Sequence, residues 1–440
     1  MAFLKKIYVN YKDCTNNSSF TLPAIFTEKG IVISHVRYLA WYNSKSESWK
    51  ERSCFALRLL LKYINAVPDI NNATQVLKSF TQALVTGTID LKNFTDPLNL
   101  YWRARTVRDS NNLLFHITNY TDFLATQEGH QLNRVNPFRK ATSYEERLNW
   151  CAYYQKQANV FLNHLSNNMA ISQKLSLTRT VQPHITPKIE NEYAVRFPEE
   201  HLERLLFLGF SKKDGSYDYK SQAITMLMNY GGLRKSEVFH LFVSDITLHP
   251  KYRNEAMVRV YHPEFGTAPD PKYKNRKEYL LSKTSFKPRN SYLGSERLFA
   301  GWKNPLLNSK YNYFDVVFNP PEKARDFLAI WAKYLKYQRV EAPRNNPHPY
   351  AFTNSLGLPE TIKNFQRLHR NAVEHIGLEV RKSLGTTEHG HRHAYGFRAR
   401  KAGLDQIAIQ KIMHHKNPNS CLVYIKPTTD EVIEVLRGIK

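Results

Sequence analysis

The sequence lacks long hydrophobic runs. Although 42% of its 440 residues are hydrophobic, no stretch approaches the roughly 18 apolar residues in a row that a membrane-spanning helix needs. The first fourteen residues intersperse Lys5, Lys6 and Lys12 among apolar ones, so they have no uninterrupted core of a signal peptide. These absences predict a soluble protein of the cytoplasm.

Cysteine is scarce, and internal repeats and low-complexity tracts are absent. The four cysteines are Cys14, Cys54, Cys151 and Cys421, and no two of them have the close spacing of a zinc-ligand pair. Their scatter also speaks against a disulfide framework. We therefore expect reduced thiols and no cysteine metal site.

Acidic residues are few compared with basic ones. The chain has 38 Asp and Glu against 63 Lys and Arg, which gives a formal net charge of +25. Such an excess suits a polyanionic partner, with nucleic acid first and an acidic membrane surface second. The length favours two or more domains.

The first part of the chain has the apolar spacing of helices. We expect residues 1–29 to form an N-terminal extension and residues 30–169 to form a helical domain. Its helices are predicted over 31–42, from Trp49 to before Pro68, over 76–84 up to Gly87, after Thr106 to Leu124, and from a Ser143-x-x-Glu146 capping box onward. An ordinary helical bundle would explain these spacings equally well.

Basic residues mark two places in this region. Arg103, Arg105 and Arg108 lie at the start of the fourth predicted helix, where they suit contacts to a DNA backbone or simply a solvated face. Residues 170–188 contain no acid but include Lys174 and Arg179. This composition predicts an extended basic linker that lies along DNA.

A second domain is expected over residues 189–426. A helix over 221–230 ends at Gly231-Gly232, where the chain can reverse sharply, and the turn precedes Arg234. Alternating apolar residues predict strands over 256–261 and 276–281, on either side of a proline-rich loop.

The most informative stretch runs from His389 to Tyr424. His389 and Arg392 are three residues apart, which places imidazole and guanidinium on one face of a helix, and His415 precedes Tyr424 by nine residues. Five histidines here also raise the alternative of zinc. However, histidines two apart are divided among helix faces and no His-Glu-x-x-His pattern occurs, so we expect neither metal nor cofactor.

Arg234, His389-x-x-Arg392, His415 and Tyr424, in this order, resemble the tyrosine recombinases, the phage-integrase type of site-specific DNA recombinase. The resemblance implies a mainly α fold with a small β-sheet, in which a helical core-binding DNA-binding domain precedes an α+β catalytic domain. Type IB topoisomerases share the chemistry and are one alternative. A DNA-binding regulator with an inert site is another.

The resemblance also implies roles for these residues. Tyr424 would attack the phosphodiester to give a 3′-phosphotyrosyl intermediate, while Arg234 and Arg392 stabilise the developing charge. Surrounding cations should favour the phenolate of Tyr424. His389 would take or relay the proton and His415 would donate to the phosphate. Glu237 would support the Arg234 turn.

A catalytic lysine in a β-hairpin completes the family's pattern. Lys274 and Lys272, in the loop between the two predicted strands, are the first candidates, and Lys303 is the third.

The expected partner is double-stranded DNA, so localisation to the nucleoid follows. Residues 427–440 predict an amphipathic C-terminal helix that could fold back or pass to a neighbouring subunit. In the second case the protein would form a homotetramer on DNA, with accessory DNA-bending proteins as possible partners. Integration of a mobile element is the expected role, whereas the target sequence stays open.

Overall fold

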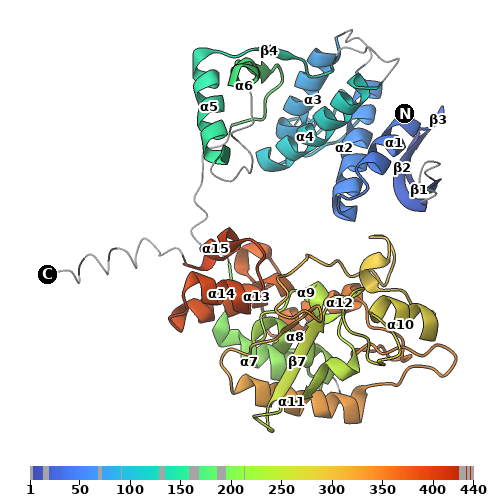
Figure 1. The fold of residues 1–440 in the computed structure, drawn as a ribbon, viewed down its shortest axis with the longest axis vertical. Coiled ribbons are helices and arrows are strands. Elements are labelled where there is room, and N and C mark those ends of the chain that lie inside the picture. The colour runs from blue at the N-terminus through green and yellow to red at the C-terminus, as the bar shows by residue number, and fades with distance from the viewer. Residues whose placement is uncertain are drawn as a thin grey trace. The chain divides into compact units, whose positions relative to one another are not determined.

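The computed structural model describes residues 3–12, 19–67, 72–90, 92–127, 134–157, 168–185, 195–212 and 214–425, together with Ile433 and Arg437. The chain is mainly α-helical with small antiparallel sheets, as the sequence predicted. It divides into two compact units, Met1–Lys188 and Ile189–Lys440 (Figure 1). Across the described residues, every helix is too short or too polar to cross a membrane.

The first unit combines helices with two small sheets. Its elements are β1 (Leu4–Lys12), β2 (Ser19–Thr27), β3 (Gly30–Ile31), α1 (Ile33–Trp41), α2 (Glu47–Ala66), α3 (Ala73–Thr86), α4 (Val107–Ala125), β4 (Phe138–Lys140), α5 (Ser143–Gln157), α6 (Asn168–Leu175) and β5 (Leu177–Arg179). The first four predicted helices are confirmed. Side chains of Ser46, Asn72 and Thr106 cap the N-termini of α2, α3 and α4 by accepting backbone N–H groups.

The expected N-terminal extension is instead part of the first unit. Strands β1, β2 and β3 form an antiparallel sheet in that order. Leu22, Ala24 and Ile25 of β2 are fully buried in the same core as α1 to α4. The sheet was not predicted, because Lys and Tyr interrupt the apolar residues of β1 and Pro23 lies within β2.

The expected extended linker over 170–188 is also corrected. Part of it is helix α6, and β5 pairs with β4. The capping box of α5 lies one residue earlier than predicted, because Thr142 and Glu145 exchange the two hydrogen bonds, with N···O distances of 2.8 and 3.3 Å.

The second unit has helices around a three-stranded sheet. Its main elements are α7 (Leu202–Arg204), α8 (Tyr219–Asn229), α9 (Lys235–Val238), β6 (Ile246–Leu248), β7 (Ala256–Tyr261), α10 (Arg276–Lys283), β8 (Tyr313–Asp315), α11 (Lys323–Lys333), α12 (Ile362–His375), α13 (Glu388–Lys401), α14 (Gln406–Ile412) and α15 (Leu422–Ile425). Short 3₁₀ and π turns extend several of them, including Glu199–His201, Leu205–Gly209, Tyr334–Gln338 and Pro418–Cys421.

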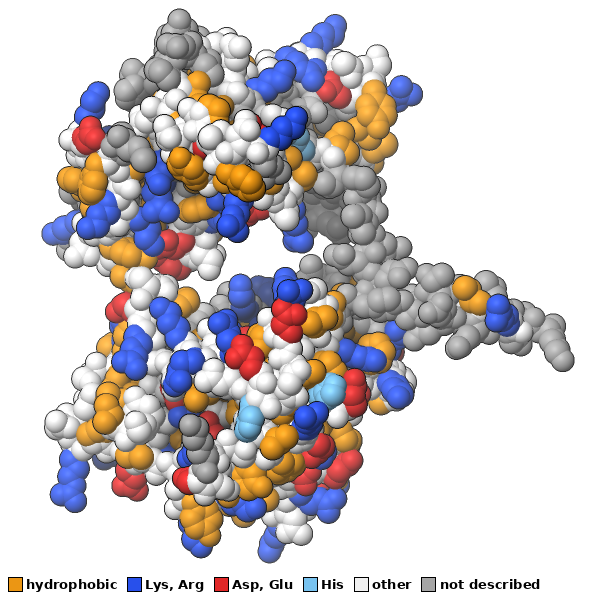
Figure 2. Space-filling model, turned by 180° about the vertical axis from the view of Figure 1, so that it is seen from behind, with side chains coloured by type: hydrophobic (Ala, Val, Ile, Leu, Met, Phe, Trp, Pro, Cys, Tyr) orange, Lys and Arg blue, Asp and Glu red, His pale blue; other side chains and the backbone are white. Residues whose placement is uncertain are grey.

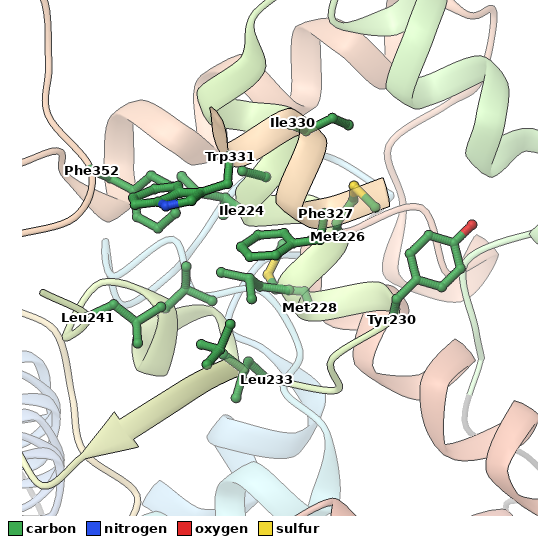
Figure 3. Packing of buried hydrophobic residues seen from close by; sticks show 14 of the residues in the cluster. Ile224, Met226, Met228, Tyr230, Leu233, Leu241, Phe327, Ile330, Trp331 and Phe352 are labelled. Carbon is green, nitrogen blue, oxygen red and sulfur yellow. The ribbon is translucent and has the colours of Figure 1, made fainter. Parts of the chain in front are cut away.

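The core of the second unit forms around α8. All of its residues are buried except the half-buried Tyr219, and α11 packs across it (Figure 3). Figure 3 shows Met226 and Met228 beside Phe327, with Trp331 and Phe352 forming an aromatic layer above them. A helix with no exposed face is fixed by its neighbours on every side, and the turn at its C-terminal end is therefore held in place.

The prediction of a strand over 256–261 is confirmed and that over 276–281 is wrong. Strand β7 lies between β6 and β8. Residues 276–281 instead belong to helix α10, whose N-cap Asn275 accepts the Glu278 N–H at 2.9 Å. The connection from β7 to β8 therefore runs over residues 262–312 rather than through a tight hairpin.

A buried ion pair explains why α10 begins where it does. The Arg276 guanidinium, 2% exposed, makes a two-point contact with the Asp245 carboxylate and donates to Thr267 O at 3.2 Å. It lies between the rings of Phe242 and Tyr261, 4.1 and 4.3 Å from their centroids. Both charges are thus removed from water and depend on each other.

We expect Arg276→Met to lower the free energy of unfolding of the second unit by about 3–5 kcal/mol, because it leaves Asp245 buried without its counter-charge. Urea unfolding of the full chain measures the change. Adding Asp245→Asn, which keeps an acceptor for the Phe242 N–H, should recover most of the loss. A double variant no more stable than Arg276→Met would contradict this account.

Candidate active site

The turn after α8 presents Arg234. Gly232 has a φ of +68°, and a Cβ there would lie 2.5 Å from the ring of Tyr395, so only glycine fits. Arg234 then caps α9: its N–H donates to Glu237 Oε2 at 2.7 Å and its Nη1 donates to Glu237 Oε1 at 2.6 Å. The Arg234 side chain is 24% exposed, so it can still reach a ligand.

Arg392, on α13, connects segments that are far apart in sequence. Its Nη1 donates to Gly232 O, its Nη2 donates to Met413 O at 2.6 Å, and its Nη1 lies 3.8 Å from Glu237 Oε2. The side chain is only 3% exposed. Burial lowers the pKa of Arg392, and Glu237 opposes that shift. Since a guanidinium stays charged in proteins, the result is a fixed cation beside the Arg234 turn.

Tyr424 is on α15, and its side chain turns inward. It is 5% exposed and packs with Tyr395, Met413 and Cys421. We expected cations to lower its pKa, but the net direction is the opposite. Burial raises the pKa of Tyr424, while Arg392 and Arg234 oppose this only in part. The buried phenol therefore keeps its proton in the ligand-free protein.

The group that contacts the Tyr424 hydroxyl is His393. Its Nδ1 lies 3.0 Å from Tyr424 Oη. His389, the expected proton acceptor, packs edge-on against His393 with ring centroids 4.3 Å apart. The sequence analysis missed this role for His393. The available signal was the four-residue spacing, which places His389 and His393 on the same face of α13.

His415 follows α14 and lies over Tyr424. Its ring stacks on that of Tyr424, with centroids 6.3 Å apart and planes 9° apart, and its Nδ1 lies 3.1 Å from Cys421 Sγ. Burial, then Arg392 and Arg234, lower the pKa of His415 to about 3. His415 is therefore neutral near pH 7.

Two further histidines of this stretch have structural roles. His391 stacks on Phe197 and bonds Asn229 and His369 at 3.0 and 2.8 Å. His414 stacks on Phe314 of β8 with centroids 3.8 Å apart. A search of the described residues finds no group of His, Cys, Asp and Glu suited to a metal ion.

The three candidate lysines have different surroundings. Lys272 and Lys274 are exposed, and their backbone N–H groups bond Asp270 and Glu278 near the start of α10. Lys303, also exposed, follows Trp302, whose ring contacts those of His240 and His262 at 5.4 and 5.3 Å.

A backbone hydrogen bond brings the Lys303 segment to the site. Three residues after Lys303, the Leu306 N–H donates to His414 O at 3.1 Å. The neighbouring Pro305 is buried. Lys303 therefore lies three residues from a backbone contact with the histidine cluster.

The basic candidates of the first unit divide into two groups. Arg103, Arg108 and Lys174 are exposed. Arg105 pairs with Asp109 at 3.1 Å, and Arg179 pairs with Asp122 while its guanidinium lies 3.8 Å over the Phe138 ring. The second group stabilises the unit itself, which the charge pattern could not reveal. Lys and Arg side chains are widespread on the visible face of each unit (Figure 2).

Comparisons with known proteins give distant structural likenesses. No protein-family model matches the sequence, and no curated protein does. A crystal structure of XerA recombinase is 14% identical, with a TM-score of 0.35, and the match covers 92% of this chain and 96% of that one. XerH site-specific recombinase bound to a palindromic difH substrate is 12% identical, with a TM-score of 0.46 and coverage of 88% and 78%.

A third structure is the lambda integrase, residues 75–356, bound to DNA. It is 10% identical, with a TM-score of 0.44, and the match covers 89% of this chain and 95% of that one. With identities below 25% and TM-scores below 0.5, the function of this chain has to be argued from its own site.

Buried histidines predict acid sensitivity. Loss of hydration most strongly lowers the pKa of eight buried or half-buried histidines, to about 3 or 4 in most cases: His35, His116, His240, His369, His391, His393, His414 and His415. Below about pH 6.5 the unfolded chain binds protons that the folded chain excludes, so folding stability falls as the pH falls.

We expect the thermal unfolding temperature to be highest above pH 6.5 and to decrease steadily between pH 6.5 and 5. Scanning calorimetry at pH 7.5, 6 and 5 measures this. The chosen range lies above the titration of ordinary carboxylates, so the histidines dominate it. An equal or higher unfolding temperature at pH 5 would contradict the buried neutral state.

Proposed function

We propose that the protein is a site-specific DNA recombinase of the tyrosine-recombinase type. It would cut and rejoin DNA strands through a 3′-phosphotyrosyl intermediate and serve the integration of a mobile element. The observation that carries this proposal is that Arg234, Arg392 and His415, from three separate segments, lie around the buried phenol of Tyr424.

The two arginines suit a phosphodiester. Attack by an oxygen nucleophile increases the negative charge on the phosphoryl oxygens, and guanidiniums offer paired donors in a fixed fork. Arg234 is partly exposed, and Arg392 uses two of its N–H groups on backbone carbonyls, which leaves three of its five donors. Both cations are already in place, so little reorganisation is needed when charge develops.

His415 fits the role of a neutral donor. Burial raises the pKa of the Cys421 thiol, so the thiol keeps its hydrogen and can donate to His415 Nδ1. The ring hydrogen of a neutral His415 is then on Nε2, where it can be given to a phosphoryl oxygen.

Lys303 is the proposed general acid for the departing 5′ oxygen. Its segment is attached to His414 through the Leu306 N–H, and Trp302 is held between two imidazoles. Lys272 and Lys274 are instead fixed beside α10. We therefore place Lys303 ahead of the two lysines that the sequence pattern favoured.

Double-stranded DNA is the proposed partner, in keeping with the net charge of +25. Assembly to a homotetramer on DNA, through residues 427–440, remains part of the proposal. Of that segment, the structure describes Ile433 and Arg437 alone. Cys14 also lies outside the described residues.

The direct test is covalent capture. A library of nicked duplexes with randomised sequence is incubated with the full chain, and adducts that resist denaturant are recovered and sequenced. We expect adducts of related sequence with the wild type and none with Tyr424→Phe, which keeps the ring but lacks the oxygen. Arg234→Ala and Arg392→Ala should each slow adduct formation by at least about a hundredfold.

Other outcomes separate the alternatives. Adducts without sequence preference, together with relaxation of supercoiled plasmid, would indicate a type IB topoisomerase. Sequence-specific binding without any adduct would indicate a regulator with an inert site.

The lysine assignment has its own test. Lys303→Ala should slow cleavage of a captured duplex by about 10²–10⁴-fold, the usual range for loss of an acid catalyst. A duplex with sulfur in place of the bridging 5′ oxygen has a leaving group that needs no proton, so it should restore the rate. Lys274→Ala is the matched control and should cleave normally. Normal cleavage by Lys303→Ala would show that another group is the general acid.

A further inference from the structure

The Tyr424 side chain is almost fully enclosed by protein. The side chain is 5% exposed, and its ring packs so closely on α13 that a Cβ at Gly396 would lie 2.9 Å from it. His393, one helical turn before Gly396, has its Nδ1 at 3.0 Å from the hydroxyl oxygen. A proton that leaves this phenol therefore meets an imidazole nitrogen directly.

A phenol in this position needs a base. Burial raises the pKa of Tyr424, so the phenolate is rarer here than for a tyrosine in water. Forming the bond from Oη to phosphorus while the oxygen still holds its proton would produce an unfavourable cationic oxygen. The proton must leave as the bond forms.

His393 has the right protonation state to accept it. Loss of hydration, followed by His389, Arg392 and Lys382, lowers the pKa of His393 to about 4. The ring is thus neutral near pH 7, and one of its nitrogens carries a lone pair. When the phenol donates to Nδ1, that nitrogen holds the lone pair and the ring hydrogen is on Nε2.

We propose, on the basis of the recombinase function above, that His393 is the general base that takes the proton of Tyr424. In this step the bond from Tyr424 Oη to phosphorus forms and the bond from phosphorus to the 5′ oxygen breaks. The phenol proton moves to His393 Nδ1, giving an imidazolium, and the leaving oxygen takes a proton from the Lys303 ammonium. On rejoining, both protons return.

His389 is assigned a different role. Its ring lies edge-on to that of His393, with planes 74° apart, on the adjacent turn of α13. This contact fixes the orientation of the His393 ring, so His389 is a positioning residue. Loss of His389 should therefore slow adduct formation less than loss of His393.

The kinetic test uses a nicked duplex recovered by covalent capture. His393→Asn places an amide near the position of Nδ1, where it can still accept a hydrogen bond but cannot take up the proton. We expect it to form the adduct about 10²–10⁴-fold more slowly than the wild type. His389→Ala should show a smaller loss and keep the wild-type pH profile.

A rescue experiment separates catalysis from folding. Difluorotyrosine at position 424 has a more acidic phenol, which depends less on a base, so it should restore much of the rate in His393→Asn. The sulfur-bridged duplex, which relieves the need for an acid, should not. A wild-type rate in His393→Asn, or no rescue by difluorotyrosine in a variant that unfolds at the wild-type temperature, would overturn the assignment.

A measurement without DNA tests the same contact independently of the recombinase function. In protein with ¹⁵N-labelled histidine at pH 7.5, the His393 Nδ1 resonance should be of the unprotonated type and should shift in Tyr424→Phe. His393→Asn identifies the resonance by its loss. A protonated Nδ1 would refute His393 as the acceptor even if adducts form. If Nδ1 is unprotonated but the protein never forms adducts, the contact is correct and the proposed recombinase function is wrong.

Discussion

The site depends on the interaction of the Glu237 carboxylate with two arginines. Arg234 and Arg392 bring two positive charges close together in a place where one of them is almost fully buried. Burying a charge without a partner is costly, and two like charges side by side are worse. Glu237, itself 1% exposed, bonds the Arg234 side chain and backbone and lies 3.8 Å from Arg392. One anion therefore holds two cations ready for a second anion to bind.

Arg392 extends this constraint to the rest of the second unit. Its bonds to Gly232 O and Met413 O join the turn after α8 to the end of α14. Met413 leads directly into His414 and His415, and His414 O in turn receives the Leu306 N–H of the Lys303 segment. A few backbone contacts around one guanidinium thus connect the segments that carry Arg234, His415 and Lys303. Substitutions at Arg392 would disturb geometry as well as charge.

Sequence patterns located what depends on local spacing and failed where distant contacts decide. The helical periodicities of α1 to α4 and the pairing of His389 with Arg392 on one helix could be predicted, since they depend on residues a turn apart. The predicted strand over 276–281 is helix α10 instead, in which Arg276 is drawn into a buried pair with Asp245. That partner is 31 residues away, and no local pattern shows it.

The identity of the base follows the same logic. His389 and His393 share a face of α13, so the spacing alone cannot say which one meets Tyr424. Gly396 decides it. At this position the absence of a side chain lets the Tyr424 ring lie against the helix, and a Cβ would meet both that ring and Met413 at 2.9 Å. The ring therefore lies one turn from His393 and two turns from His389, and its hydroxyl contacts the nearer imidazole.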